Sequence, residues 1–183
     1  AKAAMDSGVA TEPITDWEAY KKALASRLGL GNELINQINE RARKSPKTVV
    51  FSETSNFNIL KAAQIVLNEG LAKPILLGNK EVINELLEEN QLELPGVQII
   101  DPHSDQEQAR RTKYALALWG KRQRKGLTYE ETKDLMFNKH HFALMMVETG
   151  DADAFVAGTT VRYPHILKPA LEIIGVHPKF NHI

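Results

Sequence analysis

The residues best suited to chemistry form a loop of Gly158, Thr159 and Thr160. The apolar run before them, residues 154–157, predicts a buried strand, and a helical pattern follows the loop. Unpaired backbone N–H groups and the helix dipole converge at such a junction, so it favours anionic ligands. Glycine lets the backbone approach a phosphate closely, and the threonines add hydroxyl donors. We predict an anion contact here; the other interpretation is a plain strand-to-helix connection.

Basic side chains are the next candidates for binding an anion. The only dense basic cluster consists of Lys121, Arg122, Arg124 and Lys125. A guanidinium such as that of Arg122 can face phosphate groups, although a run of four charges is also typical of a solvated surface. Nucleic-acid binding is disfavoured, because no aromatic residues interleave with the cluster. Lys168 is either a phosphate contact or an exposed lysine before Pro169, which would open a helix.

Carboxylates and histidines complete the candidates. Glu53 follows the first predicted strand, where it is either a site residue or a turn carboxylate favoured by the dipole of the next helix. The pair His140 and His141, with Asp151 and Asp153, could suggest a metal site. Adjacent helical side chains point about 100° apart, so the two imidazoles cannot easily share an ion. We therefore predict no metal site at these residues.

The elements that must position these residues follow a regular order. Two helices are expected first, at residues 16–28 with a capping box of Thr15 and Glu18, ended by Gly29 and Gly31, and at residues 33–43. Strands are then predicted at 48–52, 74–77, 97–100 and 154–157. Helices are predicted at 57–69, 81–89, from a box at Ser104 to near Gly120, after a box at Thr128, and at 139–149. This alternation predicts an α/β fold, a three-layer, doubly wound parallel sheet.

Composition narrows the class of protein. With 183 residues, 43% of them hydrophobic, the chain can bury a sizeable core. The 23 basic residues balance 23 acidic ones, so we expect no nucleic-acid or membrane partner. The chain has no cysteine, which excludes disulfides and thiol catalysis and favours a cytoplasmic location. No apolar run approaches the roughly 18 residues of a membrane span.

Several ordered segments resemble the phosphate acetyl/butyryltransferase family. Residues 145–175, MMVETGDADAFVAGTTVRYPHILKPALEIIG, are similar to the family's MM…GDADG-(L/V)-V-S-G, a loop, and LRPALQIIG. Residues 47–79 look like the family's opening, and IIDP (99–102) and KRQRKG (121–126) fall in family order. Residues 1–24 instead resemble the last helix of the catalytic part of bacterial malic enzymes, AAMDSGVA-x-x-P-I-x-D-x-x-x-Y.

The resemblance implies a particular domain organisation. Residues 1–31 would be the end of a malic-enzyme portion with a linker helix, a helical junction at the N-terminus. Residues 32–183 would be the N-terminal half of a phosphotransacetylase-like domain. The parent would be an enzyme that converts malate to pyruvate with NADP and a divalent metal, Mg or Mn. NADP and the metal would be bound outside this fragment, and the resemblance implies that no catalytic residue lies within it.

The resemblance also implies a role for the domain itself. It would bind acetyl-CoA for regulation and form homo-oligomers, a dimer through this domain and a larger assembly in the parent. Contacts to acetyl-CoA are implied at Arg122, Gly158, Thr159, Thr160 and Lys168. The chain departs from the family at Val161, where a histidine is usual, and at Lys168, where an arginine is usual. A working phosphate acetyltransferase and an assembly module without a ligand are the alternatives.

Overall fold

A computed structural model describes residues 2, 5, 7–8, 14–27 and 33–176. The chain divides into two compact units, Ala1–Arg41 and Ala42–Ile183. Helix α2 spans Trp17–Arg27, and α3 spans Glu33–Lys44 across the boundary between the units. The predicted helix stop at Gly29 and Gly31 lies outside the described residues. The proposed division at residues 31 and 32 therefore stays a prediction from sequence.

The start of α2 differs from the predicted capping box. The Asp16 carboxylate accepts hydrogen bonds from the N–H groups of Glu18 and Ala19, at 2.9 and 3.0 Å. Asp16 directly precedes the first helical residue, Trp17, which is the position where a side-chain oxygen reaches the unpaired N–H groups. The cap is thus Asp16, and the prediction of Thr15 was wrong.

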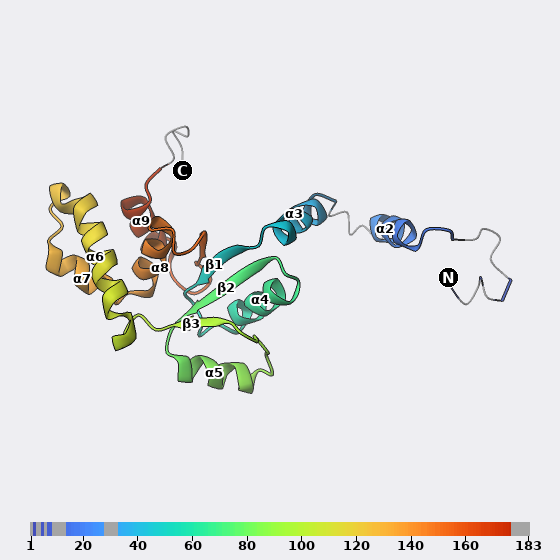
Figure 1. Cartoon of the computed structure of the whole chain (residues 1–183), viewed down its shortest axis with the longest axis horizontal. Helices are drawn as coiled ribbons and strands as arrows, with labels where there is room; N and C mark the ends of the chain where they lie inside the picture. Colours follow the sequence, from blue (N-terminus) through green and yellow to red (C-terminus); the bar gives the residue numbers. More distant parts are fainter. Residues whose placement is uncertain (1, 3–4, 6, 9–13, 28–32, 177–183) are drawn as a thin grey trace. The chain divides into compact units, whose positions relative to one another are not determined.

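The second unit is built on a four-stranded parallel sheet (Figure 1). Its strands are β1 (Lys47–Phe51), β2 (Ala72–Leu77), β3 (Gln98–Ile100) and β4 (Ala154–Val156). The spatial order is β3-β2-β1-β4, so the chain moves outward from β1 and then returns to the other side of β1. Strand order reverses between β1 and β4, and ligands bind at such switch points in α/β sheets.

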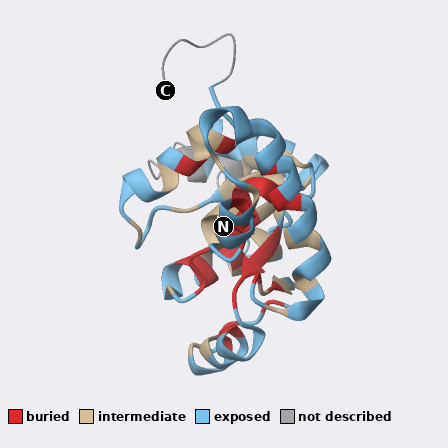
Figure 2. Cartoon of the chain, turned by 90° about the vertical axis from the view of Figure 1, so that its left-hand side faces the viewer, coloured by how far each residue is buried: buried red, intermediate tan, exposed pale blue. Residues whose placement is uncertain are grey.

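Helices cover both faces of the sheet, and this confirms the predicted three-layer arrangement. Helices α4 (Phe57–Asn68) and α5 (Lys80–Glu89) enclose one core with Phe51 and Leu76. Helices α6 (Gln108–Arg122), α7 (Tyr129–Leu135), α8 (Lys139–Glu148) and α9 (Tyr163–Ile173) enclose the other with Val50 and Leu77. Neighbouring strand residues thus serve opposite cores, and the strands are among the buried segments in Figure 2. Crossovers between parallel strands are right-handed. The chain moves one way across the sheet from β1 to β3 and the opposite way from β3 to β4, so the helices of these two parts cover opposite faces.

Helix boundaries follow local capping chemistry. At α7 the predicted box is confirmed, because the Thr128 and Glu131 side chains each accept from the other residue's backbone. The box predicted at Ser104 instead begins a 3-10 turn, Asp105–Glu107, and α6 then runs past Gly120 to Arg122. The Ser104 hydroxyl accepts from the N–H of Gln106 at 3.3 Å.

The helix after the Gly-Thr-Thr loop begins earlier than predicted. Helix α9 starts at Tyr163, with Pro164 in its first turn, and Pro169 lies inside the helix and is buried. The expectation that Pro169 opens this helix was wrong. Pro164 already supplies the fixed φ that suits a helix start, and Pro169 forgoes only one N–H while its ring packs in the core.

Candidate functional site at the carboxyl edge of the sheet

The switch point brings together three segments that are far apart in the sequence. Ser52, Glu53 and Thr54 follow β1, Gly78 follows β2, and residues 158–160 follow β4. The register pairs Phe51 with Val156, so the ends of β1 and β4 lie at the same level. The predicted anion loop therefore sits at the edge of the sheet where a ligand is expected.

Glu53 occupies the donors of that loop. Its carboxylate accepts hydrogen bonds from the backbone N–H groups of Gly158, Thr159 and Thr160, at 2.6, 2.9 and 2.7 Å. The Thr160 hydroxyl donates a fourth bond, at 2.9 Å. Glu53 is only 5% exposed. It is therefore a buried acceptor that shapes the loop and not a solvated turn carboxylate.

The opposite end of β4 is also tied to β1 by a carboxylate. Asp153 accepts from the N–H of Thr48 at 2.8 Å and from Lys47 Nζ at 3.0 Å, while its own N–H donates to the Thr48 carbonyl. The three residues of β4 are thus fastened to β1 at both ends. These bonds explain why so short a strand holds its place.

Glu53 links the stability of the fold to pH. Burial raises the pKa of Glu53, but the hydrogen bonds from Gly158, Thr160 and Thr159 outweigh it and hold the pKa below its ordinary value of 4.5. A lowered pKa in the folded state means that the charged form stabilises the fold above pH 4.5 and that this contribution is lost as the pH falls through the folded-state value.

We expect Glu53→Gln to flatten the pH dependence of stability on the acid side. The variant lacks the titrating group, so its free energy of unfolding should fall less steeply than that of the parent below about pH 4.5. Urea unfolding at a series of pH values measures this slope. Asp153→Asn is a second test at the other end of β4, where hydrogen bonds from Thr48 and Lys47 also lower the pKa of the carboxyl, so its slope should flatten as well. An unchanged slope in Glu53→Gln would contradict the assignment.

The start of α8 contributes side chains that the sequence did not single out for this edge. Ser52 Oγ lies 3.0 Å from His140 Nδ1, and Thr54 Oγ1 donates to the Leu77 carbonyl at 2.8 Å. A Cβ at Gly78 would lie 3.0 Å from Lys139 Nζ, so this ammonium reaches the end of β2. Burial lowers the pKa of His140; the charge of Glu53 opposes that effect and Lys139 adds to it. Ser52 and Thr54 come directly after β1, and this position was the available signal in the sequence.

The other predicted contacts do not lie at this loop. Arg122 Nη2 is 3.6 Å from Glu172 Oε1, near the end of α9, whereas the loop precedes the start of that helix at Tyr163. Glu172 lies nine positions after Tyr163, which is about 14 Å along a helix axis. Lys168 is exposed in the middle of α9. One ligand can meet the loop and Arg122 only if it is extended.

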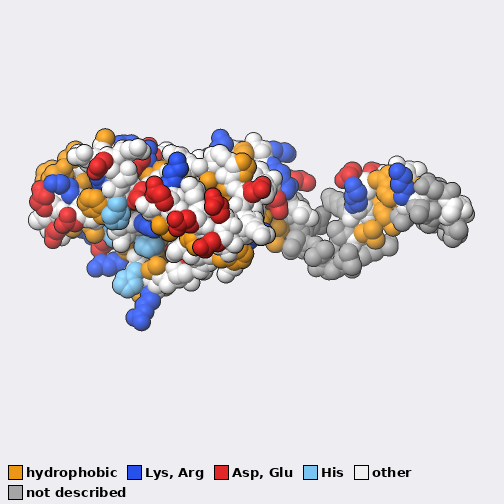
Figure 3. Space-filling model, turned by 90° about the horizontal axis from the view of Figure 1, so that it is seen from below, with side chains coloured by type: hydrophobic (Ala, Val, Ile, Leu, Met, Phe, Trp, Pro, Cys, Tyr) orange, Lys and Arg blue, Asp and Glu red, His pale blue; other side chains and the backbone are white. Residues whose placement is uncertain are grey.

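Of the other three basic residues in the cluster, one joins helices by hydrogen bonds and two are exposed to solvent. Lys121 Nζ donates to Glu148 Oε1 at 2.5 Å and to the Ile173 carbonyl at 2.6 Å, which joins α6 to α8 and α9. Arg124 and Lys125 are exposed in a short 3-10 turn. Acidic and basic side chains are both present on the face drawn in Figure 3.

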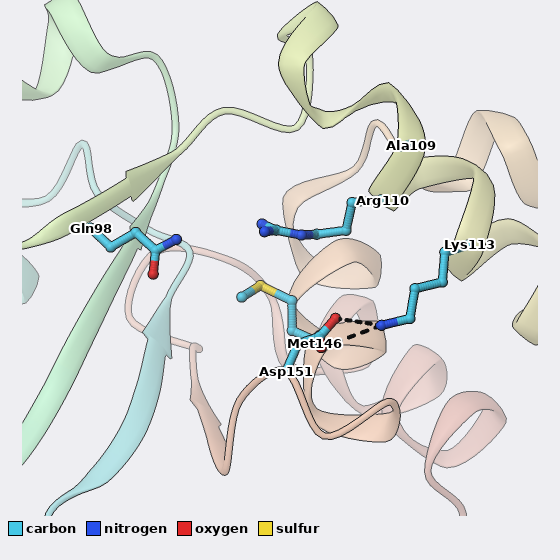
Figure 4. Close-up of a pocket in the computed structure, with 6 residues that line it drawn as sticks. All are labelled: Gln98, Ala109, Arg110, Lys113, Met146 and Asp151. Atoms are coloured by element: carbon cyan, nitrogen blue, oxygen red, sulfur yellow. Dashed lines mark hydrogen bonds and ion pairs between the residues drawn. The ribbon is translucent and has the colours of Figure 1, made fainter.

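A cavity of about 460 Å³ is lined by Gln98 at the start of β3 and by residues of α6 and α8 (Figure 4). Figure 4 shows the Arg110 guanidinium directed across it toward Gln98, and Lys113 paired with Asp151. Arg110 Nη1 lies 2.9 Å from Glu107 Oε2 but makes no hydrogen bond to the described residues. Both cations already have a carboxylate beside them, so the cavity has no excess positive charge to attract an anion.

Among the described residues, no three or more His, Asp or Glu side chains are grouped so that they could hold a metal ion. None of the helices found there has the length and apolar character needed to cross a membrane.

The order of the strands and the loop at the switch point define a doubly wound, parallel α/β protein. The family model described as phosphate acetyl/butaryl transferase matches residues 33–183. The chain belongs to this family. A solved structure, the EutD phosphotransacetylase from Staphylococcus aureus, has the same fold, with a TM-score of 0.72 and 23% identity over 82% of this chain and 44% of that one.

Two kinds of curated relatives match the chain. An NADP-dependent malic enzyme from Rhizobium meliloti is 34% identical over 96% of this chain and 24% of its own length. A phosphate acetyltransferase from Acetivibrio thermocellus is 33% identical over 79% of this chain and 42% of its own length. The chain thus spans about a quarter of the first relative and less than half of the second.

Proposed function

We propose that this chain is the phosphotransacetylase-like domain of an NADP-dependent malic enzyme and binds acetyl-CoA as a regulator. In this proposal the oxidation of malate to pyruvate, with NADP and a divalent metal, takes place in another part of the protein. The match to a malic enzyme over 96% of the chain supports this parentage. Self-association through this domain, as a dimer, stays a prediction from sequence.

Two observations support the part of the proposal that excludes acetyl transfer. The backbone donors of the loop at the switch point, where an anionic group of a substrate would be held, are bonded to Glu53. The position where the resemblance implies a histidine is Val161, whose side chain can neither bind a phosphate nor transfer a proton. These features favour a regulatory site over acetyl transfer.

The proposal predicts saturable acetyl-CoA binding without formation of acetyl phosphate. The full-length enzyme should bind acetyl-CoA in calorimetry, and acetyl-CoA should change its rate of malate oxidation. Acetyl-CoA with phosphate should give no acetyl phosphate above the uncatalysed rate. Efficient turnover would instead establish the alternative, a phosphate acetyltransferase, which the Acetivibrio thermocellus relative favours. Absence of binding would leave an assembly module.

Arg122→Ala should weaken the response to acetyl-CoA and leave malate oxidation without acetyl-CoA nearly unchanged. A charge-assisted hydrogen bond is worth about 1.5–3 kcal/mol, so the half-effective concentration should rise roughly ten- to a hundredfold. Dose–response curves on the full-length enzyme measure this shift. Arg124→Ala, at an exposed site in the same cluster, is the matched control. An unchanged response would assign Arg122 to its ion pair with Glu172 alone.

A further inference from the structure

The loop of residues 158–160 already holds an anion, and that anion is the Glu53 carboxylate. Three successive backbone N–H groups and one hydroxyl point at its two oxygens, over distances of 2.6 to 2.9 Å. Successive N–H groups that converge in this way form a concave anion-binding site of the kind that holds phosphate groups in other proteins. Gly158 has a φ of +111°, which a residue with a side chain rarely adopts, so glycine makes this convergence possible.

The same donors cannot serve Glu53 and an external anion at full strength. Each N–H carries a single hydrogen, and that hydrogen already points at a carboxylate oxygen. A phosphate or carboxylate group placed at these N–H groups would also lie beside the negative charge of Glu53, which repels it. Glu53 is 5% exposed, so water does little to screen that charge.

We propose that Glu53 is an internal ligand of this loop, and that an external phosphate or carboxylate group gains the loop amides only when the Glu53 carboxylate is displaced or removed. In this role Glu53 competes with any anionic ligand that enters the switch point. The inference concerns anion binding by the loop and holds whether or not acetyl-CoA is the natural ligand. It also means that Glu53→Ala creates a vacant anion site, and does not merely delete a contact.

Chemical rescue tests the vacancy. We would measure the unfolding temperature of Glu53→Ala with increasing inorganic phosphate, or with acetate, at constant ionic strength set by chloride. The unfolding temperature of the variant should be lower than that of the parent without added anion. It should then rise in a saturable way, by about 5–10 °C when the anion is at roughly 100-fold excess over its dissociation constant. The unfolding temperature of the parent should rise no more than it does in chloride alone, because the Glu53 carboxylate already occupies the loop.

Asp153→Ala is the matched control, since it removes a carboxylate that bonds one backbone N–H at the other end of β4. It should lose stability without rescue by either anion. Equal rescue of Asp153→Ala, or an equal effect of phosphate on the parent, would overturn the inference by showing a nonspecific salt effect. Failure of both anions to stabilise a folded Glu53→Ala would also overturn it.

Glu53→Gln keeps the test decisive if the alanine variant does not fold. The amide retains the size of the side chain but lacks the negative charge and one acceptor. Phosphate should then shift the backbone amide resonances of Gly158, Thr159 and Thr160 in a saturable titration, and the same titration should leave those of the parent in place. Shifts of equal size in both proteins, or no shift in the variant, would show that Glu53 does not compete with phosphate for these N–H groups.

Discussion

Gly78→Ala is expected to lower the free energy of unfolding by about 2–6 kcal/mol, since a strained backbone position and an overpacked contact each cost about 1–3 kcal/mol. The φ of Gly78 is +154°, which side chains disfavour. A Cβ there would lie 2.9 Å from Thr54 Oγ1, 3.0 Å from Lys139 Nζ and 3.3 Å from Ile83 Cδ1. The lysine can swing aside at little cost. The Thr54 hydroxyl cannot, because it is buried and donates to the Leu77 carbonyl at 2.8 Å.

Two other glycines separate the causes of this loss. Gly150 has a φ of +78° but no neighbour within 4 Å, so Gly150→Ala should show the backbone cost alone, about 1–2 kcal/mol. Gly120 lies inside α6 with open space around it, and Gly120→Ala should raise stability by up to about 1 kcal/mol. Urea unfolding of the three variants gives the series. If Gly78→Ala is no less stable than Gly150→Ala, Thr54 moves away from the new Cβ at little cost.

Asp151→Ala is expected to cost about 2–3 kcal/mol, because it leaves a buried hydroxyl without its charged acceptor. The Tyr114 hydroxyl donates to Asp151 Oδ2 at 2.6 Å from a ring that is fully buried. Lys113 adds a bond at 3.0 Å. Burial raises the pKa of Asp151, but the bonds from Tyr114 and Lys113 hold it below its ordinary value. The charged form therefore stabilises the fold at neutral pH, and acid removes this contribution.

A double-mutant cycle with Tyr114→Phe isolates the pair. Removing both partners leaves no unpaired hydroxyl, so the double variant should be more stable than the sum of the two single losses predicts. Lys113→Ala is the control for the exposed member of the cluster and should cost less than 1 kcal/mol. Strictly additive losses would show that the bond between Tyr114 and Asp151 contributes little.

The sequence predicted the sheet because each strand carries its own signal. In β1 and β2, Val50 and Phe51, like Leu76 and Leu77, are apolar in succession, as expected for strands buried on both faces. The cap at Thr128 was predictable because its partner, Glu131, is three residues away. Pro169 was misjudged because a Lys-Pro step indicates a helix start by local rules, while the burial that keeps it inside α9 is tertiary.

The candidate site was only half predictable for the same reason. Gly158, Thr159 and Thr160 stand out locally, at the end of a strand. Their acceptor, Glu53, lies more than 100 residues earlier, and no local pattern links the two segments. For Arg122, local charge suggested a ligand contact, whereas its neighbour in the fold, Glu172, could not be predicted from any local pattern. Whether a ligand displaces that partner stays a prediction.

The carboxylates that fasten β4 to β1 have a consequence for how the chain folds. The bonds of Asp153 and Glu53 close loops of more than 100 residues, so they form only after a large loss of chain entropy. Strands β1, β2 and β3 with α4 and α5 can assemble from contacts much closer in sequence. We therefore expect β4 to dock late, so that a ribosome-bound chain would carry Glu53 exposed to water until β4 arrives.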